Sequence, residues 1–243
     1  MQTLMSTNAK KTKAPVSPQG RQRLPNASSD EKRERILKAA CVLFDQQGYT
    51  NTTIEQIVQT LGVTKPFVYY YFRNKQEIFE SLCWPPTEAC FTVLDFAPND
   101  QRPAHEKAID GIQRLIAATI AHYPAAFFPY REPQAFSASY HKASRALARR
   151  FYRDLCALLE EGRATGHFAF HETRITAQAA CSLPGFLYHW YRPHGRLNAA
   201  DMVSELTLLA TRVLGVVQPI PISVTKTRKR SPRSATPSIN TTT

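Results

Sequence analysis

Hydroxyl, cationic and aromatic side chains follow one another between positions 64 and 75, in the segment TKPFVYYYFRNK. Thr64 and Lys65 combine a small hydroxyl with a long hydrogen-bond donor, and side chains of these types contact base edges in the major groove of DNA. Lys75 stands where a later helix is expected to begin, so that its charge and the helix amino end both favour a phosphate. The pattern indicates contact with nucleic acid.

Three consecutive tyrosines lie in the same segment. On one short helix they cannot all face inward, because residues three and four apart share a face and adjacent residues do not. We expect Tyr71 to pack inward with Val68 and Phe72, and Tyr69 and Tyr70 to present their hydroxyls to phosphate. A purely structural role is the stronger reading for Tyr71.

Short helices must position these residues. The first is expected from about residue 29 to residue 47, with a capping box between Ser28 and Glu31 and an end at Gly48. Thr52 and Glu55 repeat the capping-box spacing for a second helix, which ends in a sharp turn at a glycine, position 62. These signals predict a first helix, a second helix and a sharp turn that leads into a third.

The third helix follows the glycine at once, and Pro66 is tolerated because it lies in the first turn. Asn74 and Glu77 form a third capping box for a fourth helix, which Pro85-Pro86 is expected to break. A second helix, a tight glycine turn and a third helix together predict a helix-turn-helix, whose third helix enters the major groove.

The stretch from Ile36 to Leu82 resembles the DNA-binding domain of the TetR family, in the runs ILKAA…LF…GY, TTIEQIV…LGVT and VYYYFRNKQEIF. The resemblance implies that residues at the start of the second helix, along the third helix and just after it touch DNA. Matched to this sequence, those positions are Thr53, Glu55, Thr64, Lys65, Pro66, Phe67, Tyr69, Tyr70, Tyr71 and Lys75. Pro66 and Phe67 depart from the smaller residues often found in the family.

The remainder is expected to form long helices over residues 104–122, 138–164, 173–191 with a kink at Pro184-Gly185, and 198–216. The predicted fold is therefore all-α. Four regions are expected: a disordered basic arm (1–27), a helix-turn-helix domain (28–84), a ligand-binding and dimerisation domain (87–217) and a disordered basic tail (218–243).

One segment of the carboxy-terminal half, WYRPHGRL, is similar to a stretch in TetR-type regulators of acyl-coenzyme A metabolism. Trp190, Arg192 and Arg196 are the expected ligand contacts, because an arginine can hold a phosphate and an aromatic ring can stack. The alternatives are a structural joint without a ligand, motif arginines that only brace the dimer, or Arg131 or Arg150 as the cationic partner. The expected aromatic wall of an apolar pocket comprises Phe127, Phe128, Tyr130, Phe136, Tyr140 and Phe151.

The resemblance also implies a homodimer in which the last two helices pair with those of a second copy. The periodicity permits this with Ala177, Ala180, Cys181 and Leu187 on one helix and Met202, Leu206, Leu209 and Val213 on the other. The expected function is a ligand-responsive repressor that a small molecule, such as an acyl-coenzyme A or another bulky apolar acid, releases from a double-stranded operator. A TetR-type multidrug sensor is the alternative within the family.

Charge and composition limit the other classes. The formal net charge is +12, and residues 1–25 and 218–243 each carry five basic residues and no acidic one. Such arms raise affinity for DNA without reading sequence, so a sequence-tolerant architectural DNA binder is a second hypothesis. Five scattered cysteines, no secretory signal and no apolar run of membrane-spanning length indicate a protein of the bacterial cytoplasm. No metal or cofactor motif and no enzyme signature is present in the sequence.

Overall fold

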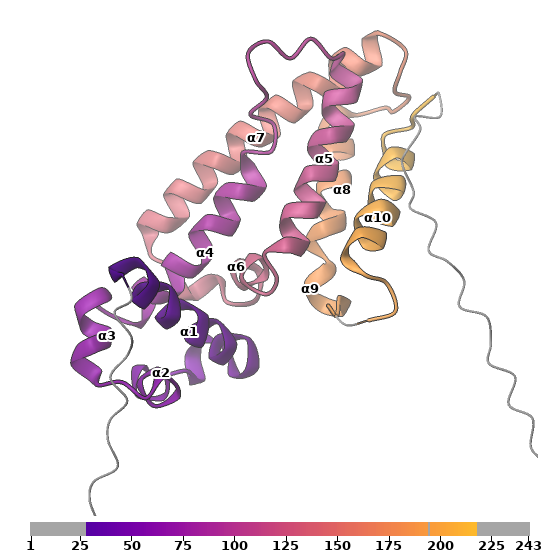
Figure 1. The fold of residues 1–243 in the computed structure, drawn as a ribbon. Coiled ribbons are helices and arrows are strands. Elements are labelled where there is room, and N and C mark those ends of the chain that lie inside the picture. Colours follow the sequence, from indigo (N-terminus) through magenta and orange to yellow (C-terminus); the bar gives the residue numbers. More distant parts are fainter. Residues whose placement is uncertain (1–27, 194, 218–243) are drawn as a thin grey trace, which may run out of the picture.

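A computed structural model describes residues 28–193 and 195–217 of the chain, and they form an all-α arrangement, as predicted (Figure 1). The α-helices are α1 (Ser29–Asn51), α2 (Ile54–Leu61), α3 (Lys65–Tyr71), α4 (Lys75–Phe91), α5 (Ala104–Ala121), α6 (Phe128–Arg131), α7 (Ala138–Ala164), α8 (Thr173–Gly185), α9 (Leu187–Trp190) and α10 (Ala199–Val213). The two predicted basic arms lie outside the described residues.

Helix capping in the amino-terminal part agrees with the sequence at α1 and differs by one residue at α2. The reciprocal box between Ser28 and Glu31 is present at α1, and the backbone leaves helical geometry at Gly48. At α2 the predicted box between Thr52 and Glu55 is wrong, because Thr53 is the cap residue and Gln56 is its partner. The Thr52 side chain is buried, and its hydroxyl donates to the carbonyl of Gly48 at 2.8 Å.

Helix α4 corrects the prediction of a break at Pro85-Pro86. It continues through both prolines to Phe91. Pro86 and its neighbours Leu82, Cys83 and Thr87 are buried. Tertiary packing therefore holds this segment helical although two backbone donors are missing. At its start the Asn74 side chain accepts a hydrogen bond from the Glu77 backbone N–H. The Glu77 carboxylate accepts from the backbone N–H of Arg73, and not from that of the cap residue Asn74.

The carboxy-terminal part surrounds α5, which lies between α4 and α7 on one side and α8 and α10 on the other (Figure 1). The predicted helices over 104–122 and 138–164 are observed almost to the residue as α5 and α7. The predicted kink near Pro184-Gly185 is the joint between α8 and α9. Among the described helices none is long and apolar enough to cross a membrane.

A cluster of aromatic rings joins the two parts of the molecule. Phe79 of α4 packs against Phe44 of α1, with ring centroids 4.8 Å apart, and against Phe128 of α6 and Phe136 at 5.3 and 5.0 Å. The residues around α6 therefore belong to the same hydrophobic core as α1–α3. In Figure 1, α6 accordingly lies close to the junction between α1 and α4.

Candidate functional site

Helices α2 and α3 form the predicted helix-turn-helix. Gly62 ends α2 with a left-handed φ of 65°, a conformation that costs glycine little. The following Val63 N–H donates to the carbonyl of Val58 at 3.2 Å, which closes the turn. Ile57 and Val68 are fully buried beneath the two helices. This core fixes α3 with its opposite face toward solvent.

The tyrosines of α3 divide as the sequence predicted. Tyr69 and Tyr70 are 46% and 80% exposed, whereas Tyr71 is half-buried and contacts the rings of Phe67 and Tyr70. Phe72 is buried. Tyr69 and Tyr70 are therefore available to a macromolecule that approaches α3.

The residues at the amino end of α3 are solvent-exposed. Thr64 is its cap residue and makes no side-chain capping bond, so its hydroxyl is free of that role. The Lys65 ammonium pairs with the carboxylate of Glu55, which lowers the pKa of Glu55 and raises that of Lys65. Thr53 and Pro66 are also exposed.

Lys75 has a structural role that the sequence did not indicate. Its ammonium donates to the carbonyls of Tyr49 and Thr52 at 2.7 and 2.8 Å, and lies 3.5 Å from that of Thr50. It also lies 4.2 Å from the centre of the Tyr49 ring. Burial lowers the pKa of Lys75. The side chain therefore ties the start of α4 to the end of α1.

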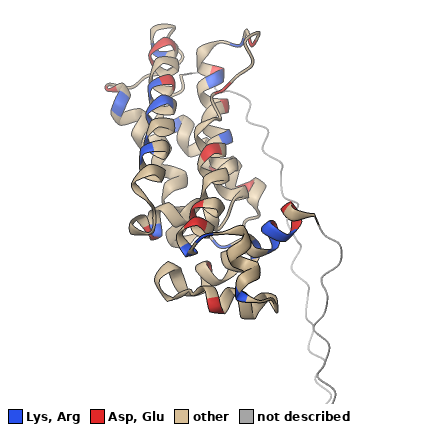
Figure 2. Ribbon diagram, turned by 90° about the vertical axis from the view of Figure 1, so that its left-hand side faces the viewer, with Lys and Arg blue, Asp and Glu red and all other residues tan. Residues whose placement is uncertain are grey.

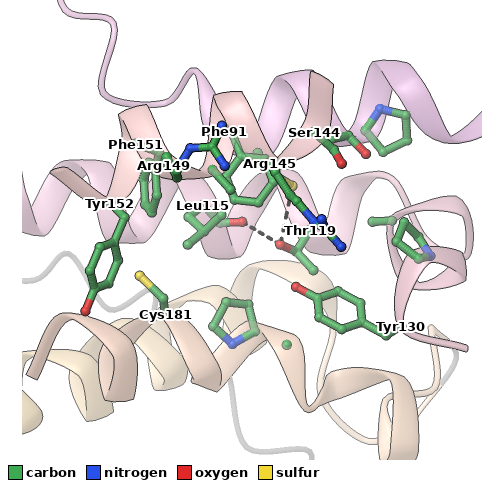
Figure 3. Close-up of a pocket in the computed structure, with 18 of the residues that line it drawn as sticks. Phe91, Leu115, Thr119, Tyr130, Ser144, Arg145, Arg149, Phe151, Tyr152 and Cys181 are labelled. Atoms are coloured by element: carbon green, nitrogen blue, oxygen red, sulfur yellow. Dashed lines mark hydrogen bonds between the residues drawn. The ribbon is translucent and has the colours of Figure 1, made fainter. Parts of the chain in front are cut away.

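A cavity of about 900 Å³ lies between α4, α5, α7 and α8 (Figure 3). Such a volume is within the range of small-molecule sites, roughly 300–1,000 Å³. Much of its wall is apolar, and the side chains that face it include Phe91, Leu115, Tyr130, Phe136, Tyr140, Phe151 and Cys181. The cavity thus offers an apolar compartment in the carboxy-terminal part.

The cavity lining also includes polar groups, both hydroxyls and arginines. The hydroxyls of Thr87 and Tyr140 lie 2.8 Å apart, and Thr87 also donates to the carbonyl of Cys83 at 2.9 Å. Thr119 donates its hydroxyl to the carbonyl of Leu115 at 2.8 Å. Burial raises the pKa of Cys181 to about 12, so that its thiol stays protonated at neutral pH. The cations are arginines of α7 and α8, and no Asp or Glu is among the described residues that line the cavity.

The structure does not bring the predicted ligand residues Trp190, Arg192 and Arg196 into this cavity. Trp190 is 53% exposed, and Arg192 and Arg196 are exposed. The Arg192 guanidinium donates to the neighbouring carbonyl of Tyr191, and Asn198 caps α10. In this structure the segment has the geometry of a joint between α9 and α10.

Other predicted pocket residues are partly confirmed. Tyr130, Phe136, Tyr140 and Phe151 line the cavity, whereas Phe127 and Phe128 lie in the hydrophobic cores. The alternative cations do not line it, since Arg131 pairs with Asp45 at 2.7 Å and Arg150 pairs with Asp95. Arg145 and Arg149 line the cavity and were not predicted from the sequence. Their spacing on a long predicted helix was the available signal.

The predicted dimer face must also be redrawn. Five of its members are buried inside the protomer, namely Ala177, Ala180, Leu187, Met202 and Leu206. Leu209 and Val213 of α10 are 42% and 37% exposed, and Ile175 of α8 and Phe186 are more exposed still. These four residues define the outer α8–α10 face, an apolar surface without a covering element in the described part of the chain.

Comparison with known proteins agrees with this architecture. Residues 36–82 match the family described as bacterial regulatory proteins, tetR family, and residues 101–214 match the tetracyclin repressor-like C-terminal domain. SrpR, an HTH-type transcriptional regulator of Pseudomonas putida, is 38% identical over 76 residues, which are 30% of this chain and 33% of SrpR. The chain thus spans about a third of the length of the first curated relatives that it matches.

Longer matches are more distant. The uncharacterized HTH-type transcriptional regulator YhgD of Bacillus subtilis is 20% identical over 76% of this chain and 98% of its own length. Among solved structures, PfmR of Thermus thermophilus superimposes with a TM-score of 0.66 at 22% identity, over 76% of this chain and all of PfmR. The two family matches cover the helix-turn-helix and the cavity-bearing part in the expected order. The chain belongs to the TetR family of bacterial regulatory proteins.

Proposed function

We propose that the protein is a transcriptional repressor that binds operator DNA as a homodimer and leaves it when a small molecule occupies the cavity. The observation that carries this proposal is the exposed face of α3, with Tyr69, Tyr70 and the cap residue Thr64 on a rigidly packed helix-turn-helix. In a helix-turn-helix the amino end of the recognition helix, here α3, contacts base edges, and flanking groups bind phosphates.

In the proposed complex, α3 lies in the major groove with Thr64 and Lys65 at the bases. Lys65 would exchange its exposed pairing with Glu55 for a base, at little cost because an exposed ion pair contributes little. Tyr69, Tyr70 and Lys75 would contact phosphate, together with Thr53 at the amino end of α2. Lys75 makes two short bonds to backbone carbonyls and a third, longer one to the carbonyl of Thr50, and a phosphate oxygen would replace that long bond.

The effector we propose is a bulky apolar acid, for which an acyl-coenzyme A is one candidate. Support comes from the apolar cavity wall, from the arginines of α7 and α8 that line it, and from the absence of any carboxylate among its described lining residues. Arginines attract an acid, and no anionic side chain in the described lining would balance the charge of a cationic drug. AibR, a structure solved with isovaleryl coenzyme A and operator DNA, has the same fold at a TM-score of 0.61 and 15% identity. That likeness concerns the fold alone.

A short segment, residues 130–136, couples the proposed effector site to the helix-turn-helix part. Tyr130 and Phe136 line the cavity, and between them Arg131 pairs with Asp45 of α1. Glu132 accepts from the Tyr49 backbone at 3.2 Å, next to the carbonyl that Lys75 binds. A ligand that moves this segment would therefore move the end of α1 and shift the population between two reader positions.

The proposal is tested by a gel-shift competition between promoter fragments from the neighbourhood of the gene and random DNA of equal length. We expect specific binding at least about a thousandfold tighter than random binding. Equal affinity for both would replace the repressor by the architectural DNA binder. Release by hydrophobic cations alone would replace the acid effector by a multidrug sensor.

Replacing Lys65 by alanine should change the base preference of binding. A side chain that contacts a base contributes about 1–3 kcal/mol of discrimination, so preference at one or two base pairs should relax about tenfold while random DNA is bound nearly as before. Binding-site selection from a randomised library measures this. Lys142→Ala, an exposed cation of α7, is the control. An unchanged preference would contradict the proposed orientation of α3.

Replacing Val213 by glutamate should weaken the dimer. Val213 lies on the outer α8–α10 face, and a charge buried at an apolar interface without a partner is costly. We expect the dimer dissociation constant to rise at least about tenfold, with the melting temperature of the protomer little changed. Analytical ultracentrifugation of this variant and of Lys142→Glu provides the comparison. A Val213→Glu protein that remains as dimeric as the wild type would exclude this face.

A further inference from the structure

Three arginines of α7 line the cavity, Arg145, Arg149 and Arg153, and the last of these pairs with Asp154. Arg145 and Arg149 are one helical turn apart, on the same side of the helix, about 6 Å from each other along its axis. Figure 3 shows Arg145 directed across the cavity toward Thr119 and Tyr130, and Arg149 beside Phe91 and Phe151. Figure 2 shows Lys and Arg residues at several places along the long helices, with Asp and Glu residues among them.

These two guanidinium groups differ from other arginines of the same helix. Arg150 pairs with Asp95, Arg153 with Asp154 and Arg163 with Glu160. Arg145 and Arg149 have no ion pair or side-chain hydrogen bond to any described residue. The two groups together carry ten N–H donors at the cavity wall. Their charges remain available to an anion.

The surroundings select what kind of anion fits. Phe91, Leu115 and Phe151 form apolar wall beside the arginines, and the hydroxyl of Tyr130 lies opposite. A small inorganic anion would contact the arginines but leave this apolar wall in water. A molecule with an anionic end and an apolar body would satisfy both, because the arginine fork binds carboxylate and phosphate oxygens in pairs.

We propose that Arg145 and Arg149 bind the anionic head group of an amphipathic effector, whose apolar chain lies between α4, α5 and α8. This assignment rests on the proposed function for the cavity being the effector site, and it names the residues and the head-group chemistry. A carboxylate of a fatty acid and a phosphate of a coenzyme A thioester share this chemistry. Arg174 of α8, which also lines the cavity, adds a further cation on the opposite wall.

The test is isothermal titration calorimetry of the full chain with three twelve-carbon probes: laurate, lauroyl-coenzyme A and dodecyltrimethylammonium. The variants are the double substitution Arg145→Gln, Arg149→Gln and the control Lys142→Gln, which removes one exposed charge from the same helix. We expect at least one anionic probe to bind the wild type and the control equally. The double variant should bind it at least about tenfold more weakly, the loss typical of one charged hydrogen bond.

Charge reversal sharpens the experiment. The double variant Arg145→Glu, Arg149→Glu should lose the anionic probes and gain dodecyltrimethylammonium, because the apolar wall is unchanged. Binding of laurate alone assigns a carboxylate head, and binding of lauroyl-coenzyme A alone assigns the phosphates. The proposal is overturned if neither anion binds the wild type, if the glutamine variant binds as the wild type does, or if the cation is the preferred probe.

DNA release measured in parallel separates the two proposals. Arginine-dependent binding of an anion that leaves the protein on its DNA supports this head-group site and contradicts the repressor function. DNA release by an anion that is equally effective on the glutamine variant supports the repressor function and contradicts the site. Both arginines are exposed, so we expect the melting temperature of the variants to match that of the wild type.

Discussion

Replacing Phe79 by alanine is expected to lower the free energy of unfolding by about 3–5 kcal/mol, the range for a buried phenylalanine. The ring is fully buried, and its centroid lies 4.8 Å from those of Phe44 and Tyr49. It also stacks on Phe128 of α6. Removing it leaves a cavity where α1, α4 and α6 meet, so the loss should affect both parts of the molecule.

Urea unfolding followed by circular dichroism measures this difference in free energy. Tyr70→Ala is the matched control, since Tyr70 is an aromatic residue of the same amino-terminal part but is 80% exposed. Its replacement should change the free energy of unfolding by less than about 0.5 kcal/mol. The role of Phe79 as the centre of the junction would be refuted by a loss below about 1 kcal/mol. Separate transitions for the two parts in the wild type would show that the junction does not couple them.

Lys75→Ala is expected to weaken DNA binding and to destabilise the protein. Its ammonium holds the carbonyls of Tyr49 and Thr52, and leaving these without a donor should cost about 1–3 kcal/mol of stability. Affinity for operator and for random DNA should fall together, because a phosphate contact carries no sequence information. The slope of log affinity against log salt should become shallower by about one unit.

Filter binding at several salt concentrations, beside urea unfolding, separates the two roles of Lys75. Lys142→Ala should change neither quantity. If Lys75→Ala lowered stability and affinity but left the salt slope unchanged, Lys75 would position the reader without touching phosphate. If stability were unchanged, the hydrogen bonds to the end of α1 would not matter to the fold.

Local signals predicted most of the helices. Ser28 with Glu31, the glycine at position 62 and the cap residue Asn74 mark the ends of helices because each satisfies or redirects backbone groups within a few residues. The capping box of α2 was displaced because Thr52 and Thr53 are both good cap residues. Burial of Thr52 against Gly48 decides between them, and that contact requires the folded core.

The effector site was harder to predict because it depends on which face of each helix is left uncovered. Trp190 and Arg192 are of suitable types, but at the end of α9 and just after it both side chains are exposed to solvent. Arg145 and Arg150 are equally basic on the same helix, and only the position of Asp95 and the cavity distinguishes them. The residues of the dimer face were mispredicted for a similar reason, because apolar residues such as Leu206 are buried in the protomer's own core.

Helix α4 connects the helix-turn-helix with the cavity-bearing part, and its proline pair makes the stiffness of this helix uneven along its length. Pro85 and Pro86 have no N–H, so the two backbone hydrogen bonds to the carbonyls of Ser81 and Leu82 are absent. Below this point the helix is anchored in the aromatic junction, and above it the helix forms a wall of the cavity. Bending at this position breaks no backbone hydrogen bond. We therefore expect α4 to bend here before it bends elsewhere. Small displacements of the cavity wall would thus be concentrated into a rotation at one known position.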